Sequence, residues 1–220
     1  MISGLCGGRE CADWWIMARK SSRAMWAAHL AGEGRRTAAA AGSAVDEPAP
    51  VGRPFRGVVL GIDPSLRGTG LALVSIEGRD VARLIAHRVV RVSVREAMPA
   101  CLAAIFRAVS ECLDREDVRH VALEETIYVQ NFQTAQRLGA ARGAAITAAA
   151  LSGHPVFEYP PLRIKQAVTG FGRASKEQMI RQIRDLLRLR EPLLSDAADA
   201  AGAAICHAAT WKETDGELVE

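Results

Sequence analysis

Four acidic residues have the type and spacing to form a metal-dependent catalytic site: Asp63, Glu124, Asp196 and Asp199. Asp63 ends an apolar run at 57–62, and Glu124 ends a second run at 121–123. Asp196 and Asp199 lie three residues apart, on one side of a predicted helix. Burying a charge is costly unless it is paired or binds a metal, so carboxylates at the ends of core strands predict a functional site.

Phosphodiester hydrolysis is the chemistry that such a set would serve. Negative charge develops on the attacking and leaving oxygens, and two divalent ions about 4 Å apart stabilise both. Hard oxygen ligands favour Mg²⁺ or Mn²⁺. In this interpretation Asp63 bridges the two ions, Glu124 holds one, and Asp196 with Asp199 holds the other. A metal-dependent nuclease is therefore the leading hypothesis.

Each acidic position also has a plainer interpretation. A strand that ends in Asp63 and enters a turn is also typical of the phosphate loops of actin-like ATPases and of ordinary strand–turn junctions. Glu124 and Glu125 point to opposite faces of their strand, and we assign Glu124 to the site because it shares a face with Ala122. Acids in the first turn of a helix, such as Asp196, also compensate the helix dipole.

A basic segment precedes the last acidic pair. Eight basic and only two acidic residues lie between 163 and 190, which is a local net charge of +6. On a predicted helix at 176–189, Arg181, Arg184 and Arg188 fall on one face. Basic faces are commonly just solvated, but this one lies in sequence between Glu124 and Asp196. It would contact phosphates and make binding sensitive to salt.

These residues are positioned by an alternation of strands and helices from 57 to 210. Strands are predicted at 57–62, 69–76, within 82–94, 118–124 and 155–159. Helices are predicted at 98–113, 134–151, from Pro160 and Pro161, at 176–189 and at 196–210, with Ser195 as the cap of the last. The order predicts an α/β fold with a five-stranded mixed sheet, three antiparallel strands followed by two parallel ones, flanked by helices. Gly68 and Gly70 are expected to let the second strand turn back closely.

Composition sets outer limits on the class of protein. The 220 residues are 49% hydrophobic and 24% charged, as in a soluble globular domain with an appendage. No apolar run reaches the 18 residues of a membrane span. The five cysteines form no zinc pattern, which favours a reducing compartment, and a cytoplasmic protein is expected.

The formal charge of +3 comes entirely from residues 1–56, which hold eight basic and five acidic residues, since the remainder holds 20 of each. We interpret 1–56 as a disordered extension or the product of an upstream start codon. A transit peptide is also conceivable, but the acids in this segment argue against it. Residues 211–220 form a short acidic tail to which no function is assigned.

Four segments together resemble the RuvC family of Holliday junction resolvases, within the RNase H-like superfamily. They are GIDPSLRGTGLALVS at 61–75, VALEETIYVQNFQTAQRLGAARGAA at 121–145, PVFEYPPLRIKQAVTGFGRASKEQM at 155–179 and SDAADAAGAAICHA at 195–208. They occur in the family's order, and the resemblance covers essentially all of 57–210 and none of 1–56.

The resemblance implies an RNase H-like fold and a homodimer that nicks two strands of a four-way DNA junction symmetrically during recombination and DNA repair. The family's acidic ligands, two Mg²⁺ or Mn²⁺ ions per site, fall on Asp63, Glu124, Asp196 and Asp199. Its two catalytic lysines fall on Lys165 and Lys176, and the helix at 134–151 matches its dimer-forming region. RuvA and RuvB are the partners in the bacterial pathway, although a phage or mobile-element relative would work without them.

The residues expected to bind DNA are Arg163, Lys165, Arg173, Lys176, Arg181, Arg184, Tyr128 and Phe132. One departure concerns base stacking: where relatives carry an aromatic residue three positions after the catalytic Glu, this chain has Ile127. Tyr128 or Phe132 could substitute, because stacking needs only a π-face.

Three other functions stay open on the sequence. One is an RNase H-like nuclease that acts on structured RNA, and a second is a module that binds branched DNA without cutting it. The third is an actin-like ATPase, for which about 160 residues is short and no second nucleotide motif is visible.

Overall fold

A five-stranded sheet with the strand order β4-β3-β2-β5-β6 forms the centre of the protein. The computed structural model describes residues 53–78, 81–125 and 131–213, so most of the predicted extension, 1–52, lies outside the described residues. The strands are β2 (Gly57–Asp63), β3 (Gly68–Gly78), β4 (Val81–Arg91), β5 (Val118–Glu124) and β6 (Val156–Tyr159). Strand β3 is antiparallel to β2 and β4, whereas β5 is parallel to β2 and β6. The predicted mixed sheet is confirmed.

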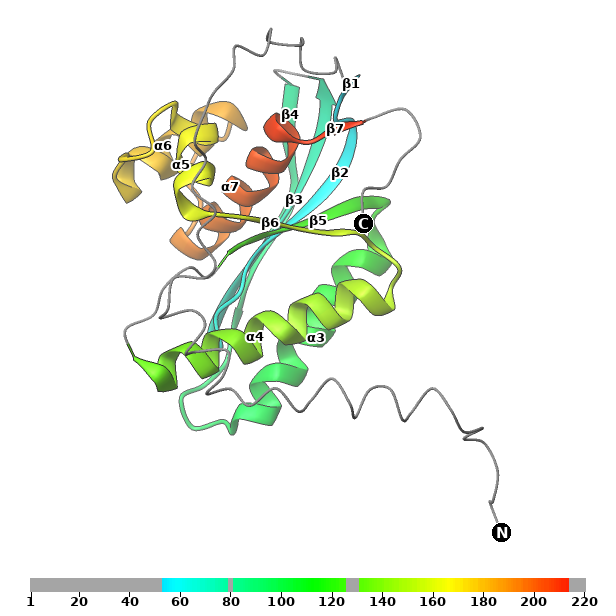
Figure 1. Ribbon diagram of the computed structural model, residues 1–220, viewed down its shortest axis with the longest axis vertical. Helices are drawn as coiled ribbons and strands as arrows, with labels where there is room; N and C mark the ends of the chain where they lie inside the picture. The colour runs from blue at the N-terminus through cyan, green and yellow to red at the C-terminus, as the bar shows by residue number, and fades with distance from the viewer. Residues whose placement is uncertain (1–52, 79–80, 126–130, 214–220) are drawn as a thin grey trace, which may run out of the picture. The chain divides into compact units, whose positions relative to one another are not determined.

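Helices cover both faces of this sheet (Figure 1). On one face lie α3 (Met98–Arg115) and α4 (Phe132–Leu151), which pack against each other. On the other face, α7 (Ser195–Thr210) packs directly on β2 and β3, and α5 (Pro161–Thr169) and α6 (Lys176–Leu186) pack against α7. Among the described helices, none has the length and apolar character needed to cross a membrane.

The alternation of side chains along the central strands divides the interior into two cores. On β2, Val59 belongs to the core that contains α7, whereas Leu60 and Ile62 belong to the core beneath α3 and α4. On β5, Ala122 faces the α7 core and Leu123 faces the opposite one. This is the period of two expected for a strand buried on both faces, and it confirms the predicted orientation around Glu124.

Two glycines bring the backbone of α7 into contact with the sheet. A Cβ atom on Gly61 would lie 1.9 Å from the carbonyl oxygen of Ala200, and one on Gly70 would lie 1.9 Å from that of Asp196. No side chain fits at either position, so the helix rests on bare strand backbone. Gly70 was expected to serve the return of the second strand, but its contact is with α7.

The end of α6 and the start of α7 differ from their prediction. Helix α6 ends at Leu186, and Arg188 follows it with φ of 53°, so Arg188 does not share the helical face of Arg181 and Arg184. Helix α7 has Leu194 at its N-cap position with no capping side-chain hydrogen bond, so the predicted cap by Ser195 is wrong. The chain reaches its helical turn one residue earlier than the cap preference of serine indicates.

The described fold extends slightly past both ends of the predicted domain, 57–210. A two-stranded sheet joins β1 (Arg53–Pro54) to β7 (Lys212–Glu213) in antiparallel register. Phe55, within the predicted extension, is 1% exposed and belongs to the α7 core. The folded body therefore includes Arg53 to Phe55, which the prediction assigned to the extension.

Buried rings fill the core at the C-terminal end of α7. The Nε2 atom of His207 lies 2.8 Å from Nδ1 of His120, and its Nδ1 lies 2.7 Å from the hydroxyl of Tyr159. Phe55 and Trp211 complete the cluster, with ring centroids 5.6 Å apart. Burial, and secondarily the nearby His120, lowers the pKa of His207 to about 3, so this imidazole is neutral at physiological pH.

Replacing Gly61 tests the contact between α7 and the sheet. We expect Gly61→Ala to lower the free energy of unfolding by about 2–4 kcal/mol, because α7 must move away from β2. Urea denaturation followed by circular dichroism would measure the change. Gly78→Ala is the matched control, since no atom lies within 4 Å of its added Cβ. Equal stability of the two variants would contradict the importance of the contact.

Candidate active site

The four predicted carboxylates converge at one end of the sheet. Asp63 and Glu124 end the adjacent parallel strands β2 and β5, and Asp196 and Asp199 lie in the first two turns of α7. The negative charges of the other three carboxylates each raise the pKa of Asp63. The carboxyl end of parallel strands, where ligands bind in open α/β sheets, is thus strongly acidic here.

Two of these carboxyl groups resist ionisation. Burial and then the charges of its acidic neighbours raise the pKa of Asp63 to about 7. Burial also raises the pKa of Glu124, with a further contribution from Asp199. Positive charge brought to this point would favour the ionised form of both groups.

Lysine side chains supply the positive charge that is present. Lys176, the first residue of α6, places its Nζ atom 2.8 Å from Oδ2 of Asp199. That hydrogen bond is the main cause of a raised pKa for Lys176. Lys165 on α5 lies within electrostatic range of Glu124, because its positive charge opposes part of the rise in the pKa of Glu124. Lys176 therefore contacts one carboxylate, and Lys165 is near enough for its charge to act on another.

The donor set fits a hard divalent cation. All four candidate ligands offer carboxylate oxygen, the donor that Mg²⁺ and Mn²⁺ prefer. Burial raises the pKa of Asp63 most, and the charges of the three neighbouring carboxylates raise it further. Among the described residues, however, no three His, Cys, Asp or Glu side chains are already gathered closely enough to enclose an ion. The carboxylates are neighbours rather than a preformed cage.

Hydrogen bonds from Thr69 and Arg67 hold the loop between β2 and β3, which follows Asp63. The sequence analysis did not identify either residue. The Thr69 hydroxyl is fully buried, donates to the carbonyl of Ser65 at 2.5 Å and accepts the Ser65 N–H at 3.2 Å. The Arg67 guanidinium donates to the carbonyls of Ser93 and Glu96 ahead of α3. The sequence feature that could have indicated this role is the polar Thr69 at the otherwise apolar start of β3. These bonds restrict the loop beside the carboxylates.

The predicted DNA-binding residues lie mostly at the surface. Arg163, Arg173 and Arg181 are exposed. Arg184 is partly buried and forms an ion pair with Asp185 at 2.7 Å, which reduces its availability. Phe132 begins α4 and is 75% exposed. Tyr128 lies outside the described residues, as does Ile127.

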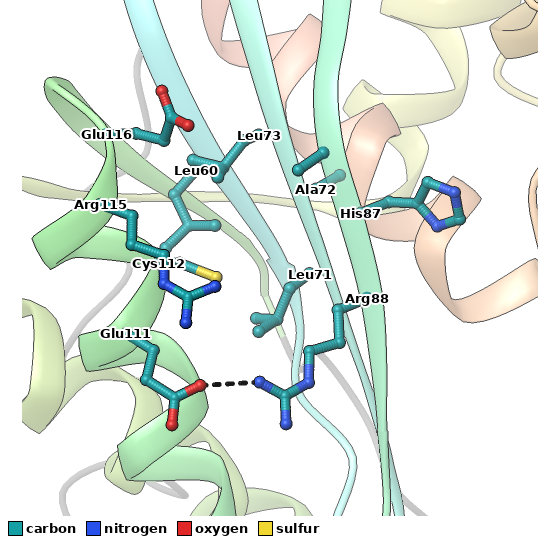
Figure 2. A pocket seen from close by; sticks show the side chains of 11 residues that line it. Leu60, Leu71, Ala72, Leu73, His87, Arg88, Glu111, Cys112, Arg115 and Glu116 are labelled. Carbon is teal, nitrogen blue, oxygen red and sulfur yellow. Dashed lines mark hydrogen bonds and ion pairs between the residues drawn. The ribbon is translucent and has the colours of Figure 1, made fainter.

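A separate hollow of about 240 Å³ lies between the sheet and α3 (Figure 2). Its floor includes Leu60, Leu71 and Leu73, and the ion pair of Arg88 with Glu111, 2.9 Å long, crosses its rim. These leucines belong to the core beneath α3, on the face of the sheet away from α7. Because it contains none of the four carboxylates, we exclude this hollow as the candidate active site.

Comparison with known families gives a match over most of the folded body. Residues 59–207 match the family model for the crossover junction endodeoxyribonuclease RuvC. A relative of that name from Halorhodospira halophila is 45% identical over 150 residues, which cover 68% of this chain and 89% of the relative. Another from Geotalea uraniireducens is 41% identical over 150 residues, covering 68% and 87%. The matched segment contains all four carboxylates and both lysines.

Comparison with solved structures gives the same family and fold. Thermus thermophilus RuvC in complex with a Holliday junction substrate is 38% identical with a TM-score of 0.66, covering 69% of this chain and 93% of that one. The yeast mitochondrial Holliday junction resolvase Ydc2 is 15% identical with a TM-score of 0.52, covering 73% and 80%, and shares the fold.

The raised pKa of Asp63 predicts a pH-dependent stability in the absence of divalent ions. The pKa is 3.8 ordinarily and about 7 in the folded protein, so between these values the folded state keeps a proton that the unfolded state loses. The free energy of unfolding of the wild type should therefore fall, relative to Asp63→Asn, as the pH rises from 4 to 7. Thermal denaturation of both proteins in EDTA across this range would measure it, and parallel curves would contradict the assignment.

Proposed function

Because this chain belongs to the RuvC family of crossover junction endodeoxyribonucleases, we propose that it resolves four-way DNA junctions by nicking two strands symmetrically during recombination and repair. The observation that carries the proposal is the convergence of Asp63, Glu124, Asp196 and Asp199 at one end of the sheet. Four carboxylates at one point repel each other, and divalent ions would neutralise that repulsion. The same ions would stabilise the negative charge that develops on a phosphate during hydrolysis.

The four carboxylates are the proposed ligands of the metal ions, with Mg²⁺ as the physiological ion and Mn²⁺ as a substitute. Bound ions would supply activation of a water molecule and stabilisation of charge on the phosphate. Burial of Asp63 and Glu124 limits solvent screening, which strengthens their attraction for a cation. The hydrogen bonds between Ser65 and Thr69 would hold the adjoining loop in place while substrate binds.

The two lysines serve the scissile phosphate in this proposal. Lys176 is half exposed, with 52% of its side chain accessible, although it contacts Asp199. An ammonium group at this boundary can interact with the phosphate as negative charge develops on it. Lys165 approaches from α5, the neighbouring helix. Together they place positive charge on the side of the site away from the strands.

A homodimer supports symmetric cutting, because two nicks in one junction require two active sites. On α4, Ala141, Ala145 and Ala148 are buried in the core shared with α3, whereas Gly139 and Gly143 have open space at the position of an added Cβ. Small residues one turn apart permit a second helix to approach closely. We propose this outward face of α4 as the dimer contact, with a two-fold axis.

The basic segment from 163 to 190 is the proposed DNA-binding surface. We also propose RuvA and RuvB as partners of the protein and the cytoplasm as its location. Arg163, Arg173 and Arg181 would contact phosphates beside the lysines. Lowering the salt concentration should therefore tighten junction binding.

The decisive test is cutting of a synthetic four-way junction and of a linear duplex of the same sequence, with Mg²⁺, by the wild type and by Asp63→Asn. We expect paired symmetric nicks in the junction alone and none with the variant. Equal cutting of both substrates would indicate a general nuclease. Cutting of structured RNA instead would indicate an RNase H-like ribonuclease, and binding without cutting would indicate a branched-DNA-binding module.

Lys176→Ala separates catalysis from binding. If the ammonium acts at the scissile phosphate, single-turnover cutting should slow by about 100-fold or more. The Kd for the junction, measured in Ca²⁺, should change by less than about fivefold, as for one exposed charge. Arg190→Ala, which removes an exposed charge from the same segment, is the matched control. Equal losses in cutting and binding by Lys176→Ala would contradict the catalytic role.

A further inference from the structure

The turn between α5 and α6 presents an aromatic side chain to solvent. Phe171 is 74% exposed, at a position between the helices that carry Lys165 and Lys176. A single exposed apolar side chain is ordinary on a protein surface and by itself indicates nothing. The order of this turn and the groups around it distinguish Phe171 from such a case.

Hydrogen bonds hold the turn in one conformation. The Thr169 hydroxyl accepts the N–H of Phe171 at 3.1 Å and lies 2.8 Å from the carbonyl of Lys165 and 2.9 Å from that of Phe171. Gly170 ends α5 with φ of 79°, a conformation that glycine adopts without strain. Phe171 is thus presented on an ordered turn, which reduces the entropy lost when a ligand binds.

A hollow of about 350 Å³ adjoins this ring. Its polar lining consists mainly of hydrogen-bond donors from the turn and from α6: Arg173, Gln178, Arg181 and Gln182. Within the described part of the chain, neither arginine forms an ion pair. The Oε1 atom of Gln178 accepts the N–H of Ser175 at 2.8 Å, which directs its amide oxygen to the helix cap and leaves the NH₂ group as the donor for a ligand.

The combination fits a nucleotide better than a protein side chain. Two unpaired guanidinium groups favour phosphate oxygens, and an exposed ring offers a π-face for a base. The volume lies at the lower end of the range for small-ligand sites. A protein partner would instead be expected to meet a continuous apolar surface, whereas four of the seven residues that line this hollow are Arg or Gln.

We propose that this turn binds one unstacked nucleotide of the DNA junction, with Phe171 against its base and Arg173 and Arg181 at its phosphate. The inference rests on the proposed junction-cutting function and adds a site to it. Bases within a linear duplex are stacked on both sides, whereas those at a branch point can leave the stack at lower cost. The contact therefore favours junctions over duplexes, on the turn that joins the helices of Lys165 and Lys176.

Substitutions of Phe171 test the stacking contact. Base–aromatic stacking contributes about 1–3 kcal/mol, so Phe171→Ala should weaken junction binding by about 5- to 150-fold, with little effect on duplex binding. Phe171→Leu, apolar but without a π-face, should lose nearly as much, and Phe171→Trp should bind like the wild type. Fluorescence anisotropy in Ca²⁺ would give each Kd, and thermal unfolding would verify that each variant is folded. Val94→Ala, at an 81% exposed apolar position, is the matched control and should bind normally.

A photo-cross-linker, p-benzoylphenylalanine at position 171, tests the contact directly. Cross-linking to nucleotides at the branch point would support the proposal, whereas cross-linking only to a second protein chain would overturn it. Normal junction binding by Phe171→Ala, or by Phe171→Leu, would also overturn it. If the wild type cuts junctions while these variants bind normally, the resolvase function stands and the nucleotide site fails. If the wild type neither binds nor cuts junctions, the proposed function itself fails.

Discussion

Backbone contact between α7 and the central strands determines the geometry of this protein. Gly61 on β2 and Gly70 on β3 leave no room for a side chain beneath the carbonyls of Ala200 and Asp196. The helix therefore lies closer to the sheet than side chains would allow. Because Asp196 is itself one of the contacting residues, the packing that stabilises the core also positions the acidic end of α7 beside Asp63.

The same helix positions the groups of opposite charge. On its other side, Gly202 accommodates α5 and α6: an added Cβ would lie 3.2 Å from Cγ2 of Ile164 and 2.7 Å from Cε of Met179. These two helices carry Lys165 and Lys176. One helix of small residues thus brings strands with carboxylates and helices with ammonium groups to a common point. A shift of α7 would alter both sets together.

The two ends of α7 have contrasting electrostatic environments. At its N-terminal end, burial and mutual repulsion raise the pKa of Asp63 to about 7, and that unfavourable charge is what a metal ion would relieve. At its C-terminal end, His207 is held neutral among aromatic rings and contacts His120 and Tyr159.

The sequence by itself determined the elements and the identity of the acidic positions. Strand alternation and helix periodicity are local properties, so they predicted the mixed sheet and the face of Glu124, whose neighbours Ala122 and Leu123 divide as expected. Only the tertiary structure decided the contact made by Gly70, the hydrogen bonds of Thr69 and Arg67, the start of α7 at Ser195 with Leu194 as its N-cap, and the position of Arg188. These features depend on close backbone contacts and on hydrogen bonds between segments. The local periodicity of the sequence does not predict such contacts.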